Sequence, residues 1–594
     1  MLDIDLLYQS LKIQDKMLIM SSNKAIERFD SKKLMPETIT TNPEDVPMMY
    51  RAQIGRCSLQ YAGSEADRNQ WVKEWVYPKP NQEEPRHQHL EQDLREASFH
   101  CVKVEFPYRV FSNCGQDSIQ RPVLDVRGIP FIPGSSVKGL FRRACQDRDR
   151  ITNEPNHENL TNKYCGDKEN LKPGCLRFHG AYPIGNWANR VVDVVHPQQK
   201  RQVEGKDSTS AFTLISLYKP TLIFKFSSTE KTVNWLEIEM LLYESLRPGV
   251  GGKTSTDYGL GGKPEGLSNL LPEYVSQEND RNVFHVALKG EGVSPLLLDK
   301  TKTPEFRPNM FKATLRGHFS RLLAGVCDCE PVVEAEVNRL LGGPDRRGND
   351  REGVIKLFWE SHKLDYNWKK CPTSYEIEGV LHIATNSKAQ INDLNFVRGV
   401  LKFAYIMGGV GKSWRRVWHE KFYPDYFQQE EQKFHIGCHW ESLTPTWGEF
   451  QQHNASQQLQ DFLAQVYQQC CDRLGSHPPK SLNWRESWHP DRVLVYSKVV
   501  SDSKIVRLFH KEKFKTTPAI GGRTSGEKRP TSVSSVWHRM LPLPNNQYLE
   551  IVTVFHGDRT AWKRQGQDQL NPFIKAIKSA LKITPPTWGN ESKL

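Results

Sequence analysis

The chain has 594 residues, with 81 lysines and arginines against 69 aspartates and glutamates, and a formal net charge of +12 at pH 7. At this length two or three compact units are expected. No apolar run approaches the roughly 18 residues that a bilayer span needs, and the start MLDIDLLYQS lacks the basic region and apolar core of a signal peptide. We therefore expect a cytoplasmic protein with no membrane partner, whose positive charge favours an anionic partner such as nucleic acid.

We interpret residues 1–95 as an N-terminal accessory segment, because they end in the proline-broken polar run YPKPNQEEPRHQHLEQD. A strand is then predicted by FHCVKVEFPYRVF, which has apolar residues at every second position. A helix start is predicted by GIPFIPGSSVKGLFRRACQ, where Ser135 and Ser136 can cap free N–H groups. Lys138 and Arg142 fall four residues apart, on one face of that helix, and make its start a candidate anion site.

A glycine-rich basic loop, RPGVGGKTSTDYGLGGK, follows the predicted helix WLEIEMLLYESL and contains Gly252, Lys253 and Thr254. A phosphate-binding P-loop would follow a strand and would have a glycine where this chain has Arg247, so we reject a nucleotide-hydrolysing function. Glycines allow a phosphodiester to approach the main chain closely, and the lysine supplies positive charge. The loop therefore predicts contact with a nucleic-acid backbone.

The same order of signals returns in the second half of the chain. A strand is predicted by VFHVALKGEGV, and a helix with Lys312 and Arg316 on one face by FRPNMFKATLRGHFSRLLAG. A second helix, LNFVRGVLKFAYIM, leads into GGVGKSWRRVWHE, where Trp414 is a candidate for stacking on a base. The small and basic residues of this second loop are further candidate RNA contacts: Gly411, Lys412, Ser413, Arg415 and Arg416. Two signals that recur in the same order indicate an internal duplication.

These signals divide the chain into a first domain over residues 96–275 and a second over 283–594, joined by a polar, turn-rich segment. We interpret residues 430–594 as completing the second domain, with a helical insertion around 445–480, and leave a separate third domain open. No CxxC pair occurs among the cysteines, so no metal site is predicted.

Several segments carry a resemblance to a known family. The stretch Ile129–Gly139 resembles a signature of the RAMP superfamily, the repeat-associated RNA-binding proteins that form the backbone of type III CRISPR effectors. Gly251–Gly259 resembles the glycine-rich loop that closes the same domain, and DVVHPQQ at Asp193–Gln199 is similar to a feature of one backbone-capping branch. The second half resembles the family more loosely, because Asn309 and Met310 stand where Gly-Ser-Ser would be.

The resemblance covers about residues 96–425 and implies an α+β fold of two tandem ferredoxin-like, RRM-type RAMP domains with insertions. It implies binding of a CRISPR guide RNA, of target single-stranded RNA paired with that guide, and of other subunits of a type III effector complex. Some members cut the target through a loop aspartate, and here Asp117 and Asp299 lie in the corresponding loops. Cleavage would use Mg²⁺ or another divalent ion. Gln120 and Arg121 stand nearest the family's expected acid, which favours an inactive first domain.

Two other functions stay open. One is a purely architectural subunit that caps or bridges the complex without catalysis. The other is a generic RNA-binding protein with tandem RRM domains, which is disfavoured because the chain lacks the aromatic strand motif of ordinary RRMs.

Overall fold

The computed structural model describes most of the chain beyond residue 75, and every described residue belongs to one compact unit, Arg56–Leu594. Residues that are not described are 1–75, 78, 80, 113–121, 152–158, 189, 196–198, 206–211, 255–257, 265–282, 295–303, 345–349, 368, 370–372, 387, 429–433, 476–477 and 522–532. The predicted accessory segment therefore lies mostly outside the described residues. Within them, no helix is both long and apolar enough to cross a bilayer.

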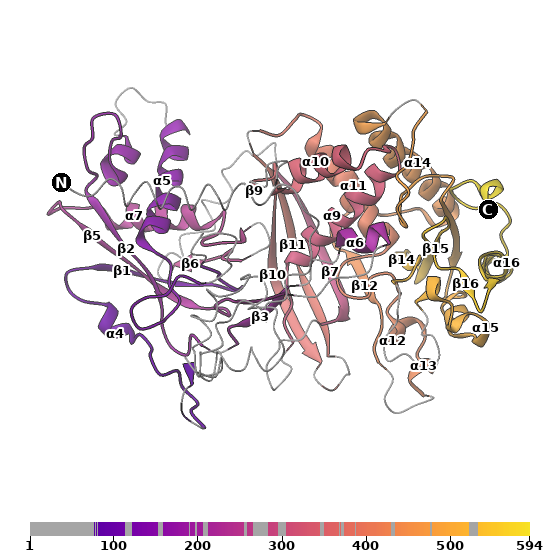
Figure 1. Cartoon of the computed structure of the whole chain (residues 1–594), viewed down its shortest axis with the longest axis horizontal. Coiled ribbons are helices and arrows are strands. Elements are labelled where there is room, and N and C mark those ends of the chain that lie inside the picture. Colours follow the sequence, from indigo (N-terminus) through magenta and orange to yellow (C-terminus); the bar gives the residue numbers. More distant parts are fainter. Residues whose placement is uncertain are drawn as a thin grey trace, which may run out of the picture. The chain divides into compact units, whose positions relative to one another are not determined.

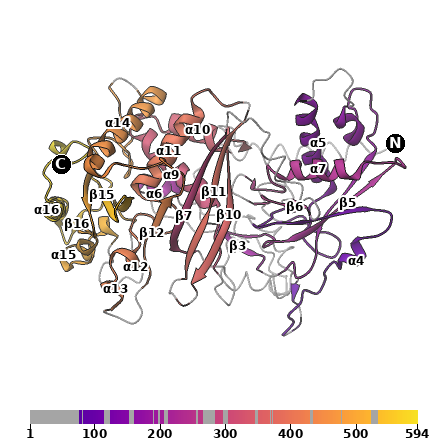
Figure 2. The same ribbon diagram turned by 180° about the vertical axis from the view of Figure 1, so that it is seen from behind.

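The first sheet has four strands, which lie in the order β2, β5, β1, β6 with every neighbouring pair antiparallel. They are β1 (His100–Glu105), β2 (Leu176–Pro183), β5 (Thr221–Ser228) and β6 (Lys263–Pro264). The helices between them are α5 (Gly134–Ile151) and α7 (Trp235–Leu246), which lie on the same side of the sheet in both views (Figures 1 and 2). This is the ferredoxin-like order, in which the third strand lies between the first and second and the fourth pairs with the first.

Local sequence explains these elements. In β1, Val102 and Val104 are buried while Lys103 and Glu105 are more exposed, as the predicted alternation requires. Helix α7 begins where the side chain of Asn234 accepts a hydrogen bond from the Glu237 N–H at 3.2 Å.

The sheet face opposite these helices is covered by the chain that precedes β1. The short helix α4 (Glu91–Leu94) contacts β5, and the thiol of Cys101 donates to the carbonyl oxygen of Leu94 at 3.3 Å. The ammonium of Lys225 lies 4.2 Å from the centre of the Phe99 ring. This face is therefore occupied by the protein itself.

A two-stranded arm leaves the first sheet. It comprises β3 (Val192–Val195), α6 (Gln199–Glu204) and β4 (Phe212–Ile215), with β3 and β4 paired antiparallel. Val203 of α6 is fully buried in a hydrophobic core made mainly by residues beyond 283. The tip of the arm thus packs into the second half of the chain.

The second sheet repeats the order of the first. Its strands are β7 (Val283–Val293), β10 (Ile355–Asn367), β11 (Ser374–Thr385) and β12 (Cys438–Ser442). They lie in the order β10, β11, β7, β12, again antiparallel throughout. The helices between β7 and β10 are α9 (Asn309–Ala324) and α10 (Glu330–Leu341), joined to the small pair β8 (Gly343–Pro344) and β9 (Asp350–Arg351), and α11 (Asp393–Met407) follows β11. The short helices α12 (His419–Phe422) and α13 (Asp425–Gln428) precede β12.

A third sheet follows helix α14 (Ala455–Leu474). Its strands β13 (Val493–Val500), β14 (Val536–Leu543) and β15 (Gln547–Phe555) lie in the order β13, β15, β14. The short helix α15 (Glu512–Lys515) precedes β14, and the pair β16 (Lys563–Arg564) and β17 (Gln567–Asp568) precedes helix α16 (Leu570–Leu581). After α16, Trp588 forms an antiparallel bridge with Val495 on the free edge of β13. The third sheet thus has the same order, with its fourth strand reduced to one bridge.

The prediction of an α+β fold is confirmed, and the ferredoxin-like order occurs in both four-stranded sheets. For residues 283–594 the sequence predicts one domain, whereas the structure forms two sheets there, and α14 lies within the range of the predicted helical insertion. One face of the third sheet shares a core with the helices of the second, through residues such as Trp537 and Phe311. Its other face packs on α16, for example through Phe573.

Candidate nucleic-acid interface

The start of α5 packs tightly against β2 at a glycine. Any larger residue there would force the helix or the strand to move. A Cβ on Gly134 would lie 2.0 Å from the carbonyl oxygen of Phe178. Ile132, just before it, exchanges two main-chain hydrogen bonds of 2.9 Å with Ala181. The Pro-Gly-Ser-Ser segment is thus fixed by its neighbours, while Ser135, Ser136 and Lys138 are exposed. This leaves an accessible helix start with hydroxyls and a positive charge, a chemistry that suits an anion.

The first glycine-rich loop packs beside that helix start. Gly251 has φ of 82°, and a Cβ there would lie 2.3 Å from the carbonyl oxygen of Phe111 and 3.5 Å from Cδ1 of Ile132. The N–H of Gly252 donates to the same Phe111 oxygen at 2.6 Å. Lys253 has φ of 58°, in the left-handed region. The structure therefore brings together the two predicted motifs of the first unit, meaning the first four-stranded sheet with its helices and loops, and the second unit is the second such sheet with its own. Thr254 lies half-buried in the same loop.

The second unit pairs the same two elements. Gly411 has φ of 99°, and a Cβ there would lie 3.1 Å from Sδ of Met310 at the start of α9 and 3.1 Å from the Tyr375 hydroxyl. Lys412 and Ser413 follow it and are exposed. A glycine-rich loop beside a helix start thus occurs twice.

Other predicted contacts behave differently, because their side chains are engaged within the protein. Arg415 donates from Nη2 to both carboxylate oxygens of Glu486 at 2.9 Å. Arg416 donates from Nη1 to the carbonyl oxygen of Val536 at 2.6 Å and from Nη2 to Ser534 Oγ at 2.8 Å. These contacts engage Arg415 and Arg416 within the protein, and their binding to RNA stays a prediction.

Two further side chains near these loops also serve the fold. Arg316 donates to Oδ1 of Asn338 at 2.8 Å and to the carbonyl oxygen of Gly342, at the end of α10. Trp414 is 4% exposed, and its ring centre lies 4.9 Å from that of Trp537, so it fills the core rather than offering a stacking surface for a base. These contacts hold both side chains within the fold, and their contact with RNA stays a prediction.

The remaining predicted residues are only partly accessible or lie outside the described structure. Arg142 is half-buried, with Nη1 donating to the carbonyl oxygen of Gly166 at 3.5 Å, and Lys312 is half-buried on α9. Asp117 and Asp299 lie outside the described residues, so their catalytic role stays a prediction.

A buried charge network links the first two units, and its pairing was not predicted. Arg109 Nε donates to Oε1 of Glu305 at 2.7 Å, and Arg307 Nη2 lies 2.7 Å from Oε2 of Glu305 and 2.6 Å from Oδ1 of Asp193. The hydroxyl of Tyr258 donates to the other oxygen of Asp193. Burial alone would raise the pKa of Asp193, but Arg307 and Arg109 outweigh it and hold the pKa below its usual range. Asp193 lies in the DVVHPQQ segment. The resemblance of that segment to the family was the one sequence signal that pointed to Asp193.

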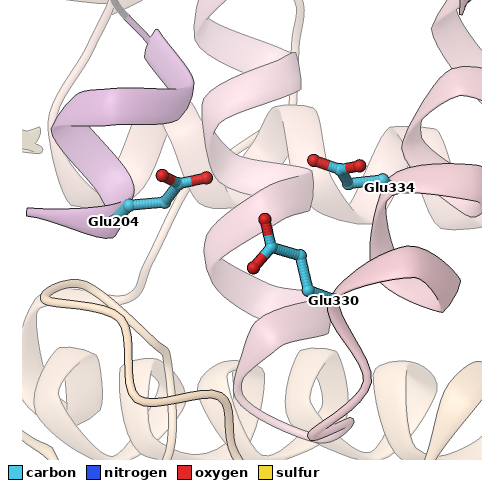
Figure 3. A group of neighbouring side chains, drawn as sticks. All are labelled: Glu204, Glu330 and Glu334. Atoms are coloured by element: carbon cyan, nitrogen blue, oxygen red, sulfur yellow. The ribbon is translucent and has the colours of Figure 1, made fainter. Parts of the chain in front are cut away.

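One group of carboxylates could hold a metal ion. The side-chain oxygens of Glu204 on α6 and of Glu330 and Glu334 on α10 lie within 4.8 Å of one another, and Figure 3 shows them converging. Carboxylates are the ligands that Mg²⁺ and Ca²⁺ prefer. None of the three belongs to the glycine-rich loops or the helix starts described above.

Similar solved structures include a crystal structure of Cmr1 from Pyrococcus furiosus in its apo form, with 15% identity, coverage of 52% of this chain and 99% of that chain, and a TM-score of 0.32. Two others are a type III-B Cmr-beta complex bound to cognate target RNA (18% identity, 29% and 63% coverage, TM-score 0.20) and a type IV-B CRISPR complex (11% identity, 29% and 91% coverage, TM-score 0.21). No curated protein matches the sequence.

The family model that matches is that of the RAMP superfamily, over residues 114–283. That span contains the start of α5, the arm and the first glycine-rich loop. The predicted resemblance is confirmed for this part of the sequence, and the chain carries a RAMP superfamily region.

Proposed function

We propose that this chain is a guide RNA-binding subunit of a type III CRISPR effector complex, assembled with other subunits and with target RNA paired to the guide. The observation that carries the proposal is the repeated pairing of a helix start with a glycine-rich loop, at Gly134 and Gly251 in the first unit and at Met310 and Gly411 in the second. The RAMP superfamily match over residues 114–283 supports it.

These groups suit contact with the RNA backbone, while base pairing provides sequence recognition. Main-chain N–H groups at a helix start and in a glycine-rich loop can donate to phosphate oxygens, and Lys138 and Lys412 add positive charge at the surface. Such contacts read the backbone of an RNA strand and leave its bases free to pair, so that the guide supplies the sequence specificity.

The alternative of a generic tandem-RRM protein is less well supported. An ordinary RRM stacks bases on aromatic side chains of its open sheet face. In the first unit, α4 and Phe99 cover that face, as the contacts of Leu94 and Lys225 show. We therefore favour binding along the loops and helix starts.

Reversing the charge at both helix-and-loop sites tests RNA binding. Lys138→Glu combined with Lys412→Glu is expected to weaken binding of single-stranded RNA roughly a hundredfold or more, since each of the two charged contacts contributes about 1.5–3 kcal/mol. The slope of log affinity against log salt should also become shallower, because fewer counterions are released. Filter binding across a salt series measures both effects.

The matched control is Lys231→Glu combined with Lys575→Glu, which makes the same charge change at exposed lysines on the loop before α7 and on α16. If both double variants lose affinity equally, the effect comes from net charge alone and the two sites are not the interface.

Target cleavage is a further proposal, in which a divalent ion at Asp117 or Asp299 assists the chemistry. A loop carboxylate can hold Mg²⁺ at the scissile phosphate or orient the attacking 2′-hydroxyl. Assembled complexes carrying Asp117→Ala, Asp299→Ala or both are expected to lose a specific cut in guide-paired RNA while RNA binding stays intact. Persistence of every cut in the double variant would mean that this subunit is architectural in this respect or that its chemistry lies elsewhere.

A further inference from the structure

A small cavity lies between the first glycine-rich loop and the start of α9. Its volume is ≈ 30 Å³, and its lining includes Arg109, Lys219, Tyr258, Arg307 and Asn309. A cavity needs about 10–15 Å³ of such volume to hold one water molecule, so this cavity holds roughly two water-sized groups. This is far below the few hundred Å³ of a typical small-molecule pocket, so it suits one small polar group and no nucleobase.

Positive charge gathers around this cavity. The charged ends of Arg109, Arg190 and Lys219 lie 5.1, 5.3 and 5.7 Å from the centre of a single ring, that of Tyr218. Like charges held so close repel one another unless negative charge offsets them. The carboxylate of Glu305 accepts from Arg109 and Arg307, so it is already shared between two guanidinium groups.

Among the residues that the structure describes here, positive charge is therefore in excess. Four cationic side chains stand against two carboxylates: Arg109, Arg190, Lys219 and Arg307 against Asp193 and Glu305. A bound anion would offset the excess, whereas a cation would increase it.

Arg109 also carries an N–H group that makes no hydrogen bond to the described residues. It is 5% exposed; its Nε donates to Glu305 and its Nη1 to the carbonyl oxygen of Arg190 and to Ser216 Oγ, both at 3.0 Å. Its buried Nη2 has no hydrogen-bond partner among the residues that the structure describes. A buried donor without an acceptor is unfavourable, and Arg109 is one of the residues that line the cavity.

We propose that this cavity binds one phosphate group of a bound RNA strand, held by Arg109 and Lys219. The cavity lies between Tyr258, at the end of the first glycine-rich loop, and Asn309, at the start of α9. A strand that passes from the first loop to the second helix start therefore crosses it. The choice of RNA as the source of the phosphate rests on the proposed function, while the anion site itself rests on the cavity, the charges and the Arg109 donor.

The test uses the full chain and inorganic phosphate as the probe. Phosphate replaces chloride at constant ionic strength, and the line width of its ³¹P resonance reports binding. Lys219→Gln is expected to lower phosphate affinity roughly tenfold, on the scale of one charged hydrogen bond. Lys219→Arg should retain binding, and the matched control Lys231→Gln should behave as the unaltered chain, because Lys231 is exposed on the loop before α7.

A second measurement separates this site from the proposed function. If RNA passes the cavity, Lys219→Gln also lowers the slope of log RNA affinity against log salt by about 0.7, the share of one phosphate contact in a single strand. Phosphate binding that is absent, or equal in Lys219→Gln and Lys231→Gln, overturns the site even if the chain binds RNA. Phosphate binding that depends on Lys219 in a chain that binds no RNA supports the anion site and overturns RNA as its source.

Discussion

Glu486→Gln is expected to lower the free energy of unfolding by about 3–5 kcal/mol, the usual cost of removing one partner from a buried ion pair. The carboxylate is fully buried and accepts from Arg321 Nε at 2.7 Å and from Arg415 Nη2 at 2.9 Å, and Arg485 lies 3.5 Å away. The glutamine would leave three buried guanidinium groups without a negative charge among them. Urea unfolding followed by tryptophan fluorescence measures the effect, because Arg321 lies against the rings of Trp414 and Trp537.

The control for this variant is Glu512→Gln, the same substitution at an exposed position on α15. A surface change of this kind is expected to stay within about 0.5 kcal/mol. Similar losses in both variants would mean that the buried network contributes little.

The same network sets a pH dependence. Burial alone would raise the pKa of Glu486, but Arg415, Arg321 and Arg485 outweigh it and lower the pKa to about 2 from an ordinary value of 4.5. A folded-state pKa below the unfolded one means that the stabilisation is complete above about pH 4.5 and is lost as the pH falls toward 2. Glu486→Gln should therefore flatten the fall of stability across this window, which acid unfolding curves of the two proteins would reveal.

Gly134→Ala and Gly139→Ala are expected to move the melting temperature in opposite directions. A Cβ at Gly134 would lie 2.0 Å from the carbonyl oxygen of Phe178, so α5 must move away from β2, at a cost of about 1–3 kcal/mol or more. A Cβ at Gly139, in the same helix, would meet no atom within 4 Å, and alanine there gains up to about 1 kcal/mol of helix propensity.

The same two variants also test RNA binding. Gly134→Ala should also weaken RNA binding, because it displaces the helix start from the first glycine-rich loop, whereas Gly139→Ala should leave affinity unchanged. Calorimetry and filter binding on the pair provide the two readouts. A shift of both melting temperatures in the same direction would show that the docking of α5 on β2 tolerates a methyl group.

The local elements of the first two units could be predicted from the sequence, because their signals are short-range. The alternation around Val102 and the turn at Gly134 correspond to β1 and the start of α5. The third sheet could not be separated in advance, since its fourth strand is a single bridge at Trp588 and leaves no periodic pattern. A pattern of period two needs several residues to be recognised.

Arg415 and Arg109 show why the ion pairs of the structure could not be predicted from the sequence. Arg415 follows a glycine-rich basic loop, which is the local pattern of a phosphate contact, but its partner Glu486 lies 71 positions away. Charge in a sequence does not show which carboxylate will be buried beside it. Arg109 could not be predicted as a site residue, because it is an isolated charge in a strand-like run. Its ion-pair partner, Glu305, lies 196 positions further along the chain.

The arm also constrains the order in which the protein can be completed during synthesis. The carbonyl oxygen of Gln202 accepts a hydrogen bond from Arg485, 283 positions later in the chain. At translation rates of about 5–20 residues per second, roughly 15 to 60 s pass before that partner leaves the ribosome. Val203 is buried in a core whose other members run from Val286 to Phe555, so this core is complete only after those partners are made. A nascent chain, or one cut short before residue 485, therefore lacks the hydrogen bond that fixes α6 at Gln202, although its first sheet is already complete.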